Sequence, residues 1–443
     1  MLFAIIAWTV GAFILVFMLR WFVQRKNITA VAVLIVLASQ VFVRPVIFFA
    51  GLDEPFPHEF FGGYDWHLIA MGILLATAWI VIFSITHILI YRPLTPFTPL
   101  LPQVNVQINT KILFFVALFT TLLGVVLTTA LILNAGSVGN FIFQVKVEKA
   151  LRGTYLIRTI SVLGAIFSIL SILYYEKKVR SANKKLRRMV YLSAILFIIN
   201  LTFNYLWGNR YNIAMLSFAL GIGWHYLIQR ISVVRVIFLV LIAAAILQAL
   251  KTFRTEAVYD ALDVDIQSTR SFWLDISTSL HLSQFDAFIL AFRDAGDRFP
   301  FREGKDFING LLAWVPRELY PEKETYHVGG WFRRVYQPKM VNGWPITTIG
   351  SWYVNFGIFG IVFGSIVSGI FASLFDASYR SVTKSYWQAA IAPSMALLLF
   401  DGGVGTGFFQ DIVLIMIPIY LLSFILNKTG RKISSSPLSA YQQ

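Results

Sequence analysis

The chain has 443 residues, of which 57% are hydrophobic and only 13% are charged. Apolar runs of about twenty residues recur along it, and such runs match the thickness of a bilayer rather than the needs of a soluble core. The net charge of +15 is divided among short segments between those runs, which argues against nucleic-acid binding. The chain has no cysteine, which excludes disulfides and thiolate metal sites.

The hydropathy pattern predicts an all-α polytopic membrane protein with about eleven transmembrane helices. In chain order the expected spans are 2–19, 28–50, 67–90, 112–134, 154–175, 189–207, 211–229, 233–250, 346–374, 386–400 and 409–426. The first run lacks a preceding basic segment and a small-residue cleavage site, so we expect it to remain as a helix. Basic residues cluster in alternate connections, and the positive-inside rule therefore places the N-terminus outside and the C-terminus in the cytoplasm.

One long polar stretch interrupts this pattern. It runs from Lys251 to Trp344 and holds 12 Lys or Arg and 13 Asp or Glu. A structureless loop of this length is uncommon, so we expect it to contain short helices of its own. The apolar run Phe307–Trp314 predicts a membrane-surface or re-entrant helix. The chain thus divides into helices one to eight (1–250), a large extracytoplasmic loop (251–345), helices nine to eleven (346–426) and a cytoplasmic tail (427–443).

Four arginines lie at or near the outer ends of the expected spans: Arg44, Arg158, Arg210 and Arg254. Arginine is costly inside a span, by roughly 2.5–3.5 kcal/mol at mid-helix. A lone arginine of this kind commonly extends to lipid phosphates, and that alternative stays open. Four arginines at the same membrane level favour a shared anion site, because guanidinium groups bind a diphosphate through paired hydrogen bonds.

The large loop carries a second group of candidate residues. Prolines flank Arg317 and Glu318, and His327 is followed by a glycine pair and then by Arg333 and Arg334. His327 or Glu318 is a candidate to accept a proton from an attacking hydroxyl group. A solvated surface histidine is the equally open alternative. Aromatic residues suited to stacking on sugars, or to anchoring at the membrane interface, are Trp314, Tyr320, Tyr326, Trp331 and Trp344.

The ninth expected span begins with small and polar residues. Tyr353 and Asn355 fall near its outer end and are candidates for glycan binding, with helix packing as the alternative. Two weaker signals point to metal chemistry. Asp263 and Asp265 have the spacing of some nucleotide-sugar sites, and the Asp53–Glu54 pair resembles the acidic pair of metal-dependent lipid-phosphosugar transferases.

Three segments together resemble the Wzy-type polymerases that extend O-antigen and related polysaccharides. These are Gly208–Arg210, the run Pro316–Lys323, and Gly350–Gly360 with its Asn355-Phe356-Gly357 core. The resemblance implies a GT-C-like fold related to the O-antigen ligases, with no cofactor and no metal. It implies that arginines bind the diphosphate of the lipid carrier. Arg210 and Arg317 take this role by motif, and Arg44, Arg158, Arg254, Arg333 and Arg334 take it by position.

The resemblance also implies the reaction. A growing glycan leaves undecaprenyl diphosphate and joins an incoming lipid-linked repeat unit at the outer face of the bacterial inner membrane. A chain-length regulator is the expected protein partner. Four alternatives stay open: a ligase that transfers the glycan to lipid A core, a lipid-linked oligosaccharide flippase, a metal-dependent transferase built on Asp53–Glu54, and a non-enzymatic assembly subunit.

Overall fold

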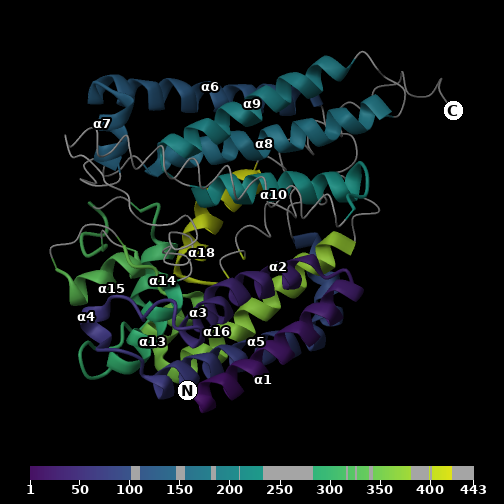
Figure 1. The fold of residues 1–443 in the computed structure, drawn as a ribbon. Helices are drawn as coiled ribbons and strands as arrows, with labels where there is room; N and C mark the ends of the chain where they lie inside the picture. Colours follow the sequence, from purple (N-terminus) through teal and green to yellow (C-terminus); the bar gives the residue numbers. More distant parts are fainter. Residues whose placement is uncertain are drawn as a thin grey trace. The chain divides into compact units, whose positions relative to one another are not determined.

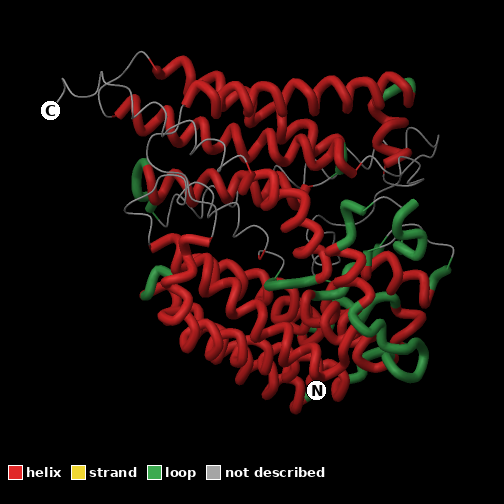
Figure 2. Tube along the Cα trace, turned by 180° about the vertical axis from the view of Figure 1, so that it is seen from behind, coloured by secondary structure: helices red, strands yellow, loops and turns green. Residues whose placement is uncertain are grey.

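The computed structural model describes residues 1–100, 110–145, 155–180, 186–208, 210–232, 283–315, 318–324, 327–338, 343–380, 399 and 402–421. Every regular element in these residues is a helix (Figure 2), and one isolated β-bridge joins Ala295 to Phe299. The chain forms two compact units. Unit 1 comprises Met1–Thr98, Thr269–Ala377 and Leu398–Leu414, and unit 2 comprises Pro99–Ser268, Ser378–Leu397 and Ile415–Gln443.

Within the described residues, seven helical spans are long and apolar enough to cross a membrane. In unit 1 they are α1 (Leu2–Gln24), the succession α2 (Ile28–Leu37), η1 (Ala38–Phe42) and α3 (Val43–Phe49), α5 (Trp66–Leu94, followed by η2, Thr95–Leu100) and α16 (Thr348–Arg380). In unit 2 they are α6 (Thr110–Ala135), α8 (Tyr155–Arg180) and α9 (Arg187–Leu206) (Figure 1). This confirms an all-helical chain with the character of a multi-pass membrane protein.

The count of eleven spans stays a prediction. The expected span 211–229 corresponds to α10 (Arg210–Leu227). The expected span 233–250 lies outside the described residues, and only Leu399 of 386–400 is described. The last expected span begins in a shorter apolar helix, Thr406–Leu421, which contains α18 (Thr406–Asp411) and η6 (Ile412–Met416).

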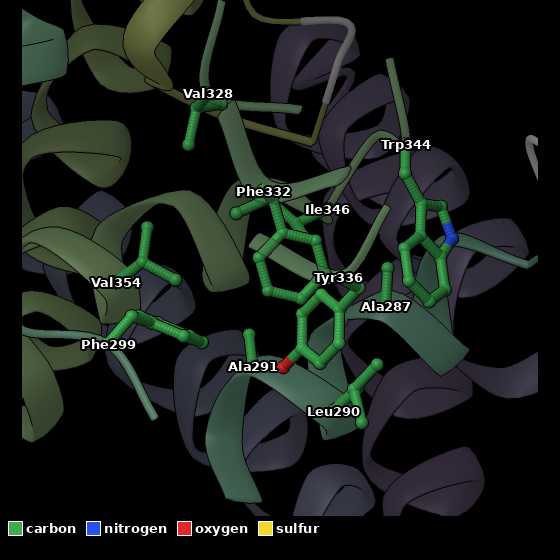
Figure 3. Packing of buried hydrophobic residues seen from close by; sticks show 10 residues of the cluster. All are labelled: Ala287, Leu290, Ala291, Phe299, Val328, Phe332, Tyr336, Trp344, Ile346 and Val354. Atoms are coloured by element: carbon green, nitrogen blue, oxygen red, sulfur yellow. The ribbon is translucent and has the colours of Figure 1, made fainter. Parts of the chain in front are cut away.

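The large loop contains short helices, as predicted from its length. They are α13 (Gln284–Asp294), α14 (Lys305–Leu311) and α15 (Val328–Tyr336). The loop between α3 and α5 adds α4 (His58–Phe61), which packs on them, because the ring of Phe60 lies 5.0 Å from that of Tyr336. We call residues 51–65 and 283–347 together the loop cap. Its buried core includes Leu290, Phe332 and Trp344 (Figure 3).

The second span is continuous but irregular. Its middle, Ala38–Phe42, is a π-helix, and Pro45 follows in the first turn of α3. Proline has no amide hydrogen, so a helix carbonyl before it loses its partner. The indole of Trp8 in α1 donates to the carbonyl oxygen of Phe42 at 2.8 Å, which joins α1 to this irregular turn.

The opposite end of the same span is held by a buried acid. Asp376 of α16 accepts hydrogen bonds from the backbone amides of Thr29 at 2.8 Å and Ala30 at 3.2 Å. These amides belong to the first turn of α2, where no intrahelical acceptor exists. His87 of α5 lies 2.9 Å from the same carboxylate, and both side chains are fully buried. One carboxylate therefore joins α2, α5 and α16.

The described part of unit 2 contains α6, α8, α9 and α10 with the short α7 (Val138–Phe143). Polar side chains bond between its apolar helices. Asn200 donates to Thr121 at 2.7 Å, and the hydroxyls of Ser171 and Ser193 lie 2.7 Å apart. Interhelical hydrogen bonds of this kind stabilise helix pairs in membranes, where apolar burial alone does not favour association.

The span α16 is broken within the Asn355-Phe356-Gly357 segment. Gly357 has φ 60° and ψ −146°, a backbone conformation outside the helical region that glycine alone adopts readily. The carbonyls of Val354 and Asn355 accept instead from the backbone amides of Arg302 and Glu303, at 2.9 and 3.0 Å. The break therefore attaches the loop cap directly to the membrane helix.

Gly357→Ala is expected to lower the free energy of unfolding by about 1–3 kcal/mol, because a side chain at this φ and ψ is strained. Denaturant titration in detergent micelles measures the change. Gly221→Ala is the matched control, since no heavy atom lies within 4 Å of the added Cβ in its helix. Equal stability of the two variants would contradict the assigned strain.

Candidate functional site

A buried arginine connects the broken helix to the loop cap. The guanidinium of Arg302 donates to both carboxylate oxygens of Asp306, at 2.7 and 2.9 Å, and also to Glu324. Its side chain is 6% exposed and lies 4.2 Å above the ring of Trp331. Burial alone lowers the pKa of Arg302, but the two carboxylates outweigh it and raise that pKa. Asn355 completes the cluster by donating to Asp306 at 3.0 Å.

A second buried arginine fastens the loop cap to the second span. Arg44 is fully buried and donates to Asp286 through Nε and Nη2, to Asp53 through Nη1 at 2.7 Å, and to the carbonyl of Glu54. Burial raises the pKa of Asp286 to about 6, although Arg44 and the amide of Phe56 lower it. The carboxyl group therefore remains ionised at neutral pH and forms an ion pair with Arg44.

This geometry differs from the sequence-based expectation for Arg44 and Asp53. The expected diphosphate ligand Arg44 has two carboxylates as partners, so its charge is neutralised inside the protein. Asp53 belongs to the acidic pair suggested as a metal site. One of its carboxylate oxygens accepts from Arg44 and the other from the amide of Glu54. Among the described residues, no group of three or more His, Asp or Glu side chains is placed to hold a metal ion.

A third ion cluster lies between α13 and α15. Asp294 accepts from Arg293 at 2.5 and 3.1 Å and from the hydroxyl of Tyr336 at 2.8 Å. Burial by itself raises the pKa of Asp294, but the hydrogen bonds from Arg293 and Tyr336 outweigh it and hold that pKa below its usual value. Burial and the bond to Asp294 raise the pKa of Tyr336 well above its usual value. Arg293 is thus neutralised as well.

Arg333 on α15 differs from these three arginines. Its guanidinium makes one hydrogen bond, to the side-chain oxygen of Gln337 at 3.0 Å. No carboxylate within the described part of the chain forms an ion pair with it. Burial lowers the pKa of Arg333, as expected for a cation partly removed from water without a counter-ion. An anionic ligand would supply the missing charge.

The other expected site residues fall into three groups. His327, Glu318 and Trp314 are exposed on the loop cap, and Tyr320, Trp331 and Arg334 are half-buried there. Arg158 and Arg210 lie in unit 2, at the beginnings of α8 and α10. Arg254, Arg317 and Tyr326 lie outside the described residues.

Two expected glycan-binding residues are buried. Tyr353 is 7% exposed, packs against Phe292 and Phe301, and donates to the carbonyl of Phe292 at 3.4 Å. Asn355 is 1% exposed and bonds to Asp306. Both side chains therefore hold the loop cap on α16, which matches the packing alternative weighed for them. Trp331 keeps partial exposure, but the guanidinium of Arg302 covers one face of its ring.

Sequence reasoning did not single out Arg302, Asp306, Glu324 or Asp286. Arg302 and Asp306 have the i, i+4 spacing of a helical ion pair, which is a detectable signal. Glu324 and Asp286 give no such signal, because their partners lie far away along the chain. A scan against protein-family models, a search of curated proteins and a search of solved structures each found no significant match.

Proposed function

We propose that this protein polymerises undecaprenyl-diphosphate-linked oligosaccharide repeat units into O-antigen or a related surface polysaccharide. The supporting observation is Arg333, a partly desolvated cation without a carboxylate partner among the described residues. It lies in the loop cap, which also contains part of the Pro316–Lys323 run. That cap is attached to α16 within the Asn355-Phe356-Gly357 segment.

The proposed reaction forms one glycosidic bond and breaks one sugar–phosphate bond. A hydroxyl group of the incoming unit attacks the anomeric carbon of the growing chain, and the electron pair of the broken bond leaves with undecaprenyl diphosphate. Arginines of unit 1 stabilise the charge that develops on this leaving group, namely Arg333 with Arg334 and Arg317. The same role for Arg158, Arg210 and Arg254, which belong to unit 2, stays a prediction from the sequence. Arg44 is assigned a positioning role, because Asp286 and Asp53 neutralise it.

The hydroxyl proton needs an acceptor late in the reaction. His327 and Glu318, both exposed on the loop cap, are the proposed acceptors. Trp314, Tyr320, Tyr326 and Trp331 are proposed to contact sugars. We place the reaction at the periplasmic face of the bacterial inner membrane, without a cofactor, and with a chain-length regulator as partner. The lipid carrier keeps both substrates in one plane, which reduces the entropy cost of bringing them together.

The test is incubation of purified protein with lipid-linked repeat units in the presence of EDTA. A ladder of polymer is the expected product. Polymer that disappears with EDTA would shift the chemistry to a metal-dependent site such as Asp53–Glu54. Transfer that occurs only when lipid A core is added would identify a ligase instead.

Transport is the second candidate, because α5 and α16 hold the fully buried His87–Asp376 pair. Ionisable residues inside spans often mark transport pathways. Protein reconstituted in vesicles separates the two functions. Movement of a fluorescent lipid-linked saccharide across the bilayer, without change in its length, would favour transport over polymerisation.

A further inference from the structure

Hydrogen bonds from Lys323 close the polar run Pro316–Lys323 into a loop. Its ammonium group donates to the carbonyl oxygens of Ala313 and Val315, the latter at 3.2 Å. These carbonyls belong to the segment that follows α14, on the carboxyl-terminal side of the helix. A cation at this end also interacts favourably with the helix dipole. Residues 313 and 323 are thereby held together.

The neighbouring residue holds the other end of the same helix. The carboxylate of Glu324 accepts from Arg302 and lies 3.2 Å from the ammonium of Lys305, the first residue of α14. Arg302 in turn bonds to Asp306, also in the first turn. The helix has seven residues and is therefore about 10 Å long. Two consecutive residues, Lys323 and Glu324, thus bind the segment after α14 and the first turn of α14, and we call them the clasp.

The described residues of the loop closed by the clasp include side chains that are largely exposed. Leu319 is 78% exposed, and Glu318 beside it is exposed too. The inward face of α14 is fixed by Phe307, whose ring lies 4.3 Å from that of Trp352 in α16. The loop after α14 has no equivalent aromatic anchor among its described residues. Its conformation therefore depends on hydrogen bonds, and the clasp supplies those at its base.

We propose that Lys323 and Glu324 are positioning residues that order the loop bearing Glu318 and Tyr320 for contact with the lipid-linked substrate. The effect of these residues on catalysis rests on the proposed function, whereas their effect on loop order does not. The clasp touches neither substrate nor leaving group in this scheme. It fixes the base of the loop, so that Glu318 and Tyr320 meet the substrate with a smaller loss of conformational entropy.

Loop order is measured first, independently of activity. The chain has no cysteine, so Leu319→Cys introduces a single thiol for a nitroxide spin label. Electron paramagnetic resonance is expected to show greater label mobility in Lys323→Met and in Glu324→Gln than in the parent. Lys323→Arg keeps a cation and is expected to restore order. Arg298→Met, which removes an exposed cation elsewhere in the loop cap, is the matched control. Unchanged mobility in Lys323→Met would overturn the clasp.

Polymer formation then separates positioning from simple stabilisation. Lys323→Met is expected to lower kcat roughly tenfold, and Lys323→Arg to recover most of the loss. Combined with Glu318→Gln, Lys323→Met is expected to cause no further loss, because it acts through the same loop. Additive losses would overturn the positioning role. If the parent protein makes no polymer, the proposed function fails, and the spin label still decides whether the clasp orders the loop.

Discussion

Asp286→Ala is expected to lower the free energy of unfolding by about 3–5 kcal/mol, the usual cost of leaving a buried charge without its partner. Arg44 keeps its fully buried position but loses the carboxylate that accepts from its Nε and Nη2 atoms. Asp53 still pairs with Nη1, but it lies at the edge of the cluster with 16% exposure. The loop cap should therefore loosen from α3.

Unfolding by denaturant in detergent micelles, followed by tryptophan fluorescence, measures this loss. Asp297→Ala removes an exposed acid of the same cap and is expected to change stability by less than about 0.5 kcal/mol. The double variant Arg44→Met with Asp286→Leu removes both charges and should be more stable than Asp286→Ala alone. A double variant less stable than the single one would show that burial of the charges is not the source of the loss.

Arg333→Ala is expected to lower kcat/KM for polymer formation by about 10²–10³-fold, the usual effect of removing one donor to a developing negative charge. Its guanidinium has no carboxylate partner in the described part of the chain, so the variant leaves no buried acid unpaired. Thermal stability should hence change little. The kcat/KM of Arg333→Lys is expected to lie between those of the parent protein and Arg333→Ala, because an ammonium group keeps the charge but cannot form paired hydrogen bonds.

Arg298→Ala is the control for Arg333→Ala, because it also removes an arginine from the loop cap. Arg298 is exposed and lies over the ring of Tyr336 at 4.4 Å. It is expected to keep nearly full activity. Direct binding of undecaprenyl diphosphate provides a second readout, which should weaken in Arg333→Ala alone. Equal activity of the two alanine variants would remove Arg333 from the proposed site.

Hydropathy was sufficient to predict the seven apolar spans, because a membrane helix needs a long apolar run whatever its neighbours are. The length and polarity of the large loop likewise predicted α13, α14 and α15. The break at Gly357 was not predicted. Small residues at the start of α16 indicated close packing, but only the amides of Arg302 and Glu303 show which carbonyls leave the helix.

The candidate site was predicted only in part, because a sequence shows which residues are charged but not which charges are neutralised. Arg44 and Arg333 looked equivalent as diphosphate ligands. They differ in the structure because Asp286, 242 positions from Arg44 in the chain, packs against Arg44 and no described acid packs against Arg333. No local periodicity encodes such a distant pairing. Positions near the membrane level therefore identified the candidate arginines, and tertiary contacts divided them into paired and unpaired ones.

The cap that Asp376 provides for α2 has a consequence for biosynthesis. Thr29 is made early, but the carboxylate that accepts its amide hydrogen lies 347 residues later. At about 5–20 residues per second, the ribosome reaches that acid on the order of 20–70 s afterwards. During this interval the first turn of α2 must find other acceptors, such as water or lipid headgroups. Folding of unit 1 can thus finish only after α16 has formed. The first turn of α2, near the start of the chain, gains its buried acceptor only when α16 packs against it.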